Sequence, residues 1–173
     1  IAEIAKRHGV VYMVDNTMAS PYLCRPLSHG ANIVVNSLTK FIGGHGNSIG
    51  GMLVDGGTFD WKAHADKYPT MATPQAYYND LNFAEGFGAL PLGPDGSNVD
   101  IAFAIATRAF SLRDLGPALS PFNAFMIMTG CETLPLRMDK HCDNATAVAK
   151  YLSSHEKVSW VQYAGLLEDK YYE

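Results

Sequence analysis

The sequence lacks the features that mark membrane proteins, secreted proteins and nucleic-acid-binding proteins. No run of apolar residues is as long as a membrane-spanning helix, and no stretch has the pattern of a secretory signal peptide. The net charge of −4 comes without any block of basic residues, so nothing indicates a nucleic acid or an anionic membrane as a partner. We therefore expect a cytoplasmic protein that binds neither nucleic acid nor membrane.

Cysteine is also scarce. The chain contains Cys24, Cys131 and Cys142, an odd number, and no pair of them has the C-x-x-C spacing. This pattern indicates neither a disulfide framework nor a zinc site. We expect buried free thiols and no metal centre.

The chain does contain enough apolar material for a folded core. Of its 173 residues, 47% are hydrophobic and 17% are charged, which fits one or two globular units. The sequence begins at Ile1, inside the pattern of an amphipathic helix, and stops at Glu173. From these ends we expect a chain cut from the interior of a longer protein.

Apolar periodicity predicts an α/β fold. Short apolar runs at 10–14, 33–35 and 52–54 are typical of strands, and their short connections predict at least one antiparallel pair. We expect the first strand to be covered on both faces in a parallel sheet. Helical spacing is found at 1–8, 99–115, 121–130 and 136–153, whereas residues 158–163 alternate as a half-buried strand does. The prolines and glycines between 58 and 96 predict a long surface loop in part of that stretch.

The strongest functional pattern follows the first two predicted strands. Asp15 ends the first strand, and Lys40 follows the second, between hydroxyl side chains and a run of glycines. Ligands of open α/β sheets bind at the carboxyl ends of the strands, so Asp15 and Lys40 can face one crevice. From the residues alone two alternatives stay open, a surface lysine on a strand-to-loop turn and an aspartate that caps a loop.

Pyridoxal 5′-phosphate is the cofactor that this combination fits. It needs a lysine to form a Schiff base and a carboxylate to keep its ring nitrogen protonated. Its phosphate needs donors, and Ser37 and Thr39 point the same way if their segment is extended. The pattern therefore predicts Lys40 as the catalytic residue and Asp15, Ser37, Thr39 and Lys40 as cofactor-binding residues. The glycines from 46 to 50 do not have the dinucleotide-binding spacing, which argues against a nicotinamide cofactor.

Three motifs give the chain a family resemblance. They read V-D-N-T-x-A-S-P-Y-L-C-R-P from residue 14, H-G-A-N-I-V-V-N-S-L-T-K-F-I-G-G-H-G-N-S-I-G-G from residue 29, and L-R-D-L-G-P-A-L-S-P-F-N-A-F from residue 112. With these motifs the sequence resembles the Cys/Met-metabolism pyridoxal-phosphate enzymes of the cystathionine γ-synthase type. The resemblance runs through essentially the whole chain.

The resemblance implies a fold, a domain division and residue roles. The fold would be type I of the pyridoxal-phosphate-dependent transferases, which is aspartate-aminotransferase-like. Residues 1–134 would be the C-terminal part of the cofactor-binding large domain, and residues 135–173 the beginning of an incomplete small C-terminal domain. Lys40 would be the Schiff-base lysine and later the base that moves protons, Asp15 would pair with the pyridinium nitrogen, and Ser37 and Thr39 would bind the phosphate. Asn16 and Thr17 would have supporting roles near the ring.

The resemblance also implies an activity. The run F-I-G-G-H-G-x-S-I-G-G, with V-D-G-G-x-F-D-W after it, is most similar to the O-acetylhomoserine sulfhydrylase subgroup. That subgroup replaces the acetyl group of O-acetyl-L-homoserine, a small amino-acid substrate, with sulfide or a thiol in methionine and cysteine biosynthesis. The alternatives are a cystathionine γ-synthase, a γ-lyase or methionine γ-lyase, and, from another class, a non-catalytic truncated chain or assembly partner.

The family arrangement implies more than this chain holds. Family members are homo-oligomers, dimers of dimers with active sites shared between subunits. Segments before Ile1 and after Glu173 would supply further site residues, among them the arginine that binds the substrate carboxylate. We therefore expect residues 1–173 alone to be inactive.

Overall fold

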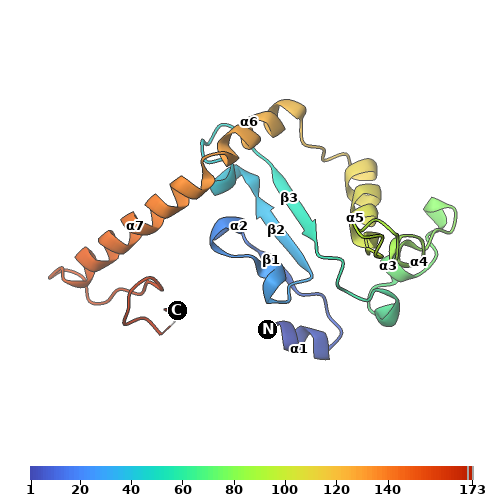
Figure 1. The fold of residues 1–173 in the computed structure, drawn as a ribbon, viewed down its shortest axis with the longest axis horizontal. Helices are drawn as coiled ribbons and strands as arrows, with labels where there is room; N and C mark the ends of the chain where they lie inside the picture. Colours follow the sequence, from blue (N-terminus) through green and yellow to red (C-terminus); the bar gives the residue numbers. More distant parts are fainter. Residues whose placement is uncertain (171, 173) are drawn as a thin grey trace.

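A three-stranded sheet lies at the centre of the computed structural model, which describes residues 1–170 and 172 (Figure 1). The strands are β1 (Met13–Asp15), β2 (Ile33–Ser37) and β3 (Gly51–Asp55), in the order β1-β2-β3. β1 is parallel to β2, and β2 is antiparallel to β3. The predicted antiparallel pair is therefore confirmed, and the parallel pair brings the carboxyl ends of β1 and β2 to one edge of the sheet.

The first strand is shorter and more exposed than the sequence predicts. β1 has three residues, and Met13 at its start is 48% exposed. The expectation of a strand at 10–14 that is covered on both faces is wrong, because β1 begins only at Met13 and two of its three residues are exposed. β2 is the central strand, and Ile33 and Val34 on its two faces are both buried.

Helix α1 (Ala2–Arg7) precedes the sheet and ends as the sequence predicts. Gly9 has a φ of +56°, a left-handed conformation that favours glycine. Its N–H donates to the Lys6 carbonyl at 3.1 Å, and the Val10 N–H donates to the Ala5 carbonyl at 3.0 Å. These two bonds form a Schellman motif, which turns the chain from α1 toward β1.

Between the strands, the chain forms short helical segments. α2 (Ser20–Leu23) and the 3₁₀ turn η1 (Pro26–His29) connect β1 to β2, and the π-helical turn η2 (Leu38–Ile42) follows β2. The connection from β2 to β3 is residues 38–50, and it begins with η2. η2 carries Lys40.

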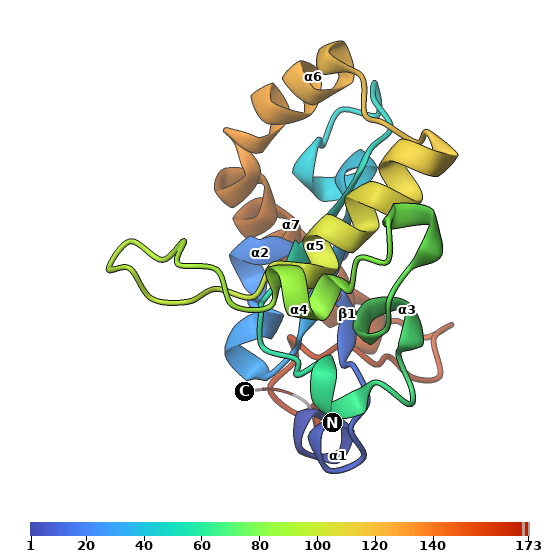
Figure 2. The same cartoon turned by 90° about the vertical axis from the view of Figure 1, so that its right-hand side faces the viewer.

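After β3 the chain folds into a group of short helices. They are η3 (Lys62–His64), α3 (Pro69–Ala72), η4 (Ala76–Tyr78), α4 (Phe83–Phe87), α5 (Ala102–Thr107) and its continuation η5 (Arg108–Arg113). A long loop connects α4 to α5 within this stretch. Figure 2 shows α3, α4 and α5 side by side, with the connection between α4 and α5 standing out from them. Their core is aromatic, since Phe59, Trp61 and Phe83 are buried in one cluster together with Ile33 of β2.

The last two helices meet at a corner next to η2. α6 (Pro121–Cys131) is capped by Ser120, whose Oγ accepts the Asn123 N–H at 3.1 Å, as the Ser-Pro pair predicts. α7 (Leu134–Ser153) starts two residues before the predicted helix and extends away from the sheet (Figure 1). A second apolar cluster joins the corner to η2, and its buried members are Leu38, Ile42, Ile127, Leu134 and Met138.

Two further expectations are wrong. Residues 158–163 form no strand, because no described strand lies beside them to complete a ladder. None of the free cysteines is fully buried, since Cys131 is exposed and Cys24 and Cys142 are half-buried.

In the part of the chain that the structure describes, no helix has the length and apolar character needed to cross a bilayer. Nor do three or more His, Cys, Asp or Glu side chains gather there as a metal ion would require.

Candidate active site

The candidate site lies where β1 and β2 end together. Asp15 is the last residue of β1 and is in register with Val35, and Ser37 is the last residue of β2. Lys40 follows in η2. The parallel pairing therefore places Asp15 and Ser37 at the same sheet edge, as the sequence predicts, with Lys40 immediately beyond it.

Thr17 links the two strand ends. Its N–H donates to Asp15 Oδ1 at 2.9 Å, and its Oγ1 accepts the Ser37 N–H at 2.8 Å. Hydrogen bonds from the Thr17 side chain and then from its N–H lower the pKa of Asp15 below its ordinary value. Asp15 is therefore a carboxylate at neutral pH, although its side chain is exposed to solvent.

Thr39 does not lie in line with Ser37, contrary to the expectation from an extended segment. The strand ends at Ser37, and η2 turns Thr39 toward the loop before β3. Thr39 Oγ1 donates to the Gly50 carbonyl at 3.3 Å and accepts the Gly50 N–H at 3.1 Å. Among the described residues no hydrogen bond involves the Ser37 hydroxyl, so it is the free donor of the pair.

The backbone of Lys40 departs from the helical conformation of η2. Its φ of −91° and ψ of −122° are not helical, whereas residues on both sides continue the turn. Its carbonyl accepts the Gly44 N–H at 2.7 Å. The side chain is exposed and lines a cavity of about 460 Å³, whose other lining residues are Thr17, Met18, Phe41, Gly44, Gly46, Arg137 and His141.

The sequence analysis did not identify the contribution of α7 to this cavity. Arg137 and His141 reach it from the first half of α7, and the His141 ring meets the Phe41 ring edge to face at 5.3 Å between centroids. Their spacing of four residues places them on one face of a helix, which is the signal that could have identified them. The sequence does not show what that face contacts, because Arg137 lies 96 residues after Phe41.

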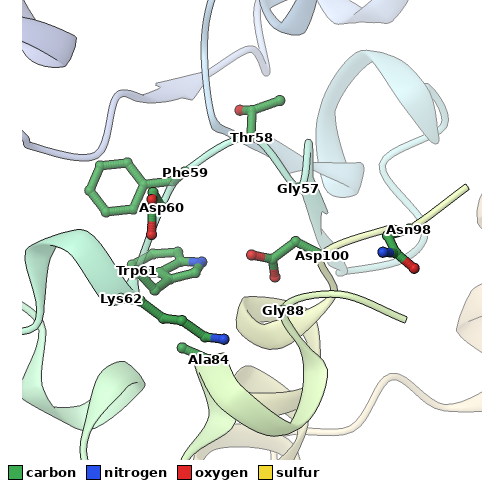
Figure 3. Close-up of a pocket in the computed structure, with 10 residues that line it drawn as sticks. All are labelled: Gly57, Thr58, Phe59, Asp60, Trp61, Lys62, Ala84, Gly88, Asn98 and Asp100. Atoms are coloured by element: carbon green, nitrogen blue, oxygen red, sulfur yellow. The ribbon is translucent and has the colours of Figure 1, made fainter. Parts of the chain in front are cut away.

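A second cavity, of about 360 Å³, lies away from Lys40 between the start of the helical group and the loop before α5 (Figure 3). Asp60, Lys62 and Asp100 line it, and none of the predicted site residues does. Burial raises the pKa of Asp100, and the nearby carboxylates of Asp55 and Asp60 add to the rise. Of the predicted site residues, Lys40 lines the 460 Å³ cavity, whereas Asp15, Ser37 and Thr39 line neither of the two cavities.

Comparison with known proteins defines the class. All of residues 1–173 match the family of Cys/Met metabolism PLP-dependent enzymes, so the chain belongs to that family. An O-acetyl-L-homoserine sulfhydrylase of Leptospira meyeri is 52% identical over 173 residues, which are 99% of this chain and 38% of the relative. A homocysteine synthase of Schizosaccharomyces pombe is 47% identical over 96% of this chain and 36% of its own length.

A solved structure is similar as well. The crystal structure of a putative O-acetylhomoserine (thiol)-lyase from Campylobacter jejuni has a TM-score of 0.83 and 36% sequence identity. The match covers 98% of this chain and 39% of that one, and that protein contains a pyridoxyl-lysine phosphate residue. These findings confirm the predicted fold and the predicted cofactor class, and the chain spans less than two fifths of the length of these relatives.

The side chains at the sheet edge have the chemistry that pyridoxal 5′-phosphate requires. Lys40 offers an amine that faces a cavity, and Asp15 offers an ionised carboxylate. Ser37 offers a hydroxyl that is free of other hydrogen bonds in the described part of the chain. The donor set therefore fits the cofactor of the family.

Proposed function

We propose that the intact protein containing this chain catalyses a γ-replacement on O-acetyl-L-homoserine. Sulfide or a thiol would replace the acetyl group, giving homocysteine or a homocysteine thioether such as methionine, together with acetate. The observation that carries the proposal is the Asp15 carboxylate and the Lys40 amine at one edge of two parallel strands. The names of the relatives, O-acetyl-L-homoserine sulfhydrylase and homocysteine synthase, support the choice of substrate.

Each site residue has a proposed role. When bound, pyridoxal 5′-phosphate supplies a ring that accepts electrons from a substrate carbanion. Lys40 would hold the cofactor covalently through Nζ and, once released, move protons between substrate carbons with the same atom. Asp15 would hold a proton at the ring nitrogen, because an ionised carboxylate stabilises the protonated form.

The hydroxyl side chains would hold the phosphate. Ser37 is the primary donor in this proposal, since its hydroxyl has no other partner among the described residues. Thr39 can exchange its 3.3 Å bond to the Gly50 carbonyl for a phosphate oxygen while it still accepts the Gly50 N–H. Asn16 and Thr17 would support the ring side of the site, and Thr17 would do so through its bonds to Asp15 and Ser37.

The proposal extends to domains, assembly and location. Residues 1–134 would belong to the large domain and residues 135–173 to the small C-terminal domain, which the corner between α6 and α7 supports. The intact protein would be a cytoplasmic homo-oligomer, a dimer of dimers that shares its active sites. In support, α6 exposes Phe122, Phe125 and Met128 at a spacing of three residues, and apolar surface of this kind is typical of protein contacts.

A product assay tests the proposed reaction. The intact protein is supplied with pyridoxal phosphate, O-acetyl-L-homoserine and sulfide, and homocysteine, acetate and 2-oxobutyrate are measured. We expect homocysteine and acetate in equal amounts. Dominant release of 2-oxobutyrate would instead identify a γ-lyase. Acetate that is released only when cysteine replaces sulfide would identify a γ-synthase.

A further inference from the structure

The turn that carries Lys40 is packed directly against the corner between α6 and α7. Gly130 lies so close to Gly43 that a Cβ atom at position 130 would overlap the Gly43 carbonyl oxygen. Ile127 and Leu134 from the two helices are buried against Leu38 and Ile42 of η2. Backbone and side chains thus both connect the corner to the two ends of η2.

Arg137 donates hydrogen bonds from all three of its guanidinium nitrogens, and two of them, Nη1 and Nη2, reach across this contact to η2. Nη1 donates to the Phe41 carbonyl at 2.6 Å, and Nη2 donates to the Ile42 carbonyl at 3.3 Å. Nη2 also donates to the Gly130 carbonyl at 2.8 Å, and Nε donates to Thr133 Oγ1 at 3.0 Å. One side chain therefore ties the corner to the two residues that follow Lys40.

The loop sequence leaves room for this guanidinium. A Cβ atom at Gly44 would overlap Arg137 Nη1, so the guanidinium would have to move, and the φ of +71° at Gly44 favours glycine. The Gly44 N–H in turn donates to the Lys40 carbonyl at 2.7 Å. The backbone around Lys40 is therefore fixed by Gly44 directly and by Arg137 through Phe41 and Ile42.

We propose that Arg137 is a positioning residue for Lys40, an inference that rests on the proposed function. By fixing the Phe41 and Ile42 carbonyls, Arg137 holds a turn in which Lys40 has non-helical dihedral angles and directs its side chain into the cavity. The planar guanidinium suits this role, because its fixed fork can reach neighbouring carbonyls at once, whereas an ammonium is a single point donor. The amine then meets the cofactor in one orientation.

The test uses the intact protein and compares Arg137→Ala, Arg137→Lys and two controls. Lys140→Ala removes an exposed charge one turn further along α7. Leu134→Ala removes a buried side chain of the same corner without removing an Arg137 hydrogen bond. For each variant three quantities are measured: the dissociation constant of pyridoxal phosphate, the visible circular dichroism per bound cofactor, and the melting temperature of the apo-protein.

We expect Arg137→Ala to raise the dissociation constant about tenfold or more and to lower the dichroism per bound cofactor about twofold. Arg137→Lys, which keeps the charge, should fall between Arg137→Ala and the wild type. Lys140→Ala should match the wild type. Leu134→Ala should lower the melting temperature and leave the dichroism per bound cofactor unchanged.

Two results would overturn the inference. One is an Arg137→Ala variant that keeps the wild-type dissociation constant and dichroism. The other is a Leu134→Ala variant whose dissociation constant rises, and whose dichroism per bound cofactor falls, as much as in Arg137→Ala. If Arg137→Ala does not fold, Arg137→Lys decides, and wild-type values in that variant count against the inference. Two measurements separate a failure of this inference from a failure of the proposed function. Cofactor absorbance that persists in Lys40→Ala would refute the role of Lys40, and the product assay tests the reaction itself.

Discussion

At the scale of single residues, the site combines side chains that the sequence identifies and side chains that it conceals. The places of Asp15 and Lys40 beside the ends of β1 and β2 could be predicted, because each comes at the end of an apolar strand pattern, and strand ends are where α/β sheets bind ligands. The hydrogen bonds by which Thr17 links the ends of β1 and β2 could not be predicted, nor could those that Arg137 donates to η2. Each set includes a hydrogen bond across the fold, over 20 residues for Thr17 and over 96 residues for Arg137.

The hydrogen bonds of Thr17 give the first prediction. Thr17→Val keeps the shape of the side chain but removes the oxygen that accepts the Ser37 N–H and bonds to Asp15. We expect the free energy of unfolding to fall by about 1 kcal/mol and cofactor binding to weaken. Chemical denaturation and cofactor titration of the intact protein measure both, with Thr17→Ser as the control that keeps the hydroxyl. Equal losses in the two variants would contradict this role of the Thr17 hydroxyl.

Asp100 gives a prediction about pH. Its pKa lies above the ordinary value of 3.8, chiefly because of burial, so the folded state binds this proton more tightly than the unfolded state does. The stability should therefore fall as the pH rises from about 3.8 through the raised pKa. Asp100→Asn, which can still accept the Ala102 N–H, should remove this part of the pH dependence. Melting temperatures of both proteins across that range test it, and parallel pH profiles would contradict it.

At the scale of elements, local signals predicted the helices better than the strands. Caps and apolar stripes are local, so α6 and α7 were found close to their observed ends. Strands need a partner, and the alternating stretch at 158–163 has none in the described chain. β1 is shorter than predicted although β2 pairs with it, and the turn at η2 separates Thr39 from Ser37. In both places the strand pattern says little about where the strand begins or ends.

The contact of the α6–α7 corner with η2 gives a prediction at this scale. Gly130→Ala places a methyl group where the Gly43 carbonyl oxygen lies, so the corner must move away from η2. We expect a loss of about 1–3 kcal/mol in the free energy of unfolding, the usual range for overpacking. Thr129→Ala, at the exposed neighbouring position, should change it by no more than about 0.5 kcal/mol. Urea denaturation of the intact protein measures both, and equal effects would contradict the close contact.

At the scale of the whole molecule, the chain leaves large apolar side chains uncovered. On α6 the exposed fractions of Phe122, Phe125 and Met128 are 69%, 62% and 65%. The chain also spans only 38% of the Leptospira meyeri relative. The cavity beside Lys40 is open to solvent, and Lys40 is exposed on its wall.

We therefore predict that a polypeptide of residues 1–173 alone neither retains pyridoxal phosphate nor consumes O-acetyl-L-homoserine. An open cavity cannot exclude water from the cofactor, and exposed apolar faces favour self-association. Size-exclusion chromatography with absorbance detection, followed by an acetate-release assay, measures both properties. A monodisperse polypeptide that turns over the substrate would refute this prediction.

The central claim is that Lys40 holds the cofactor, and the visible absorbance spectrum of the intact protein tests it most directly. The wild type, Lys40→Ala and Lys62→Ala are each loaded with pyridoxal phosphate and then freed of unbound cofactor. Lys62 is the matched control, because it lines the other cavity. We predict a cofactor band in the wild type and in Lys62→Ala, and none in Lys40→Ala. A band of wild-type position and intensity in Lys40→Ala would contradict the account.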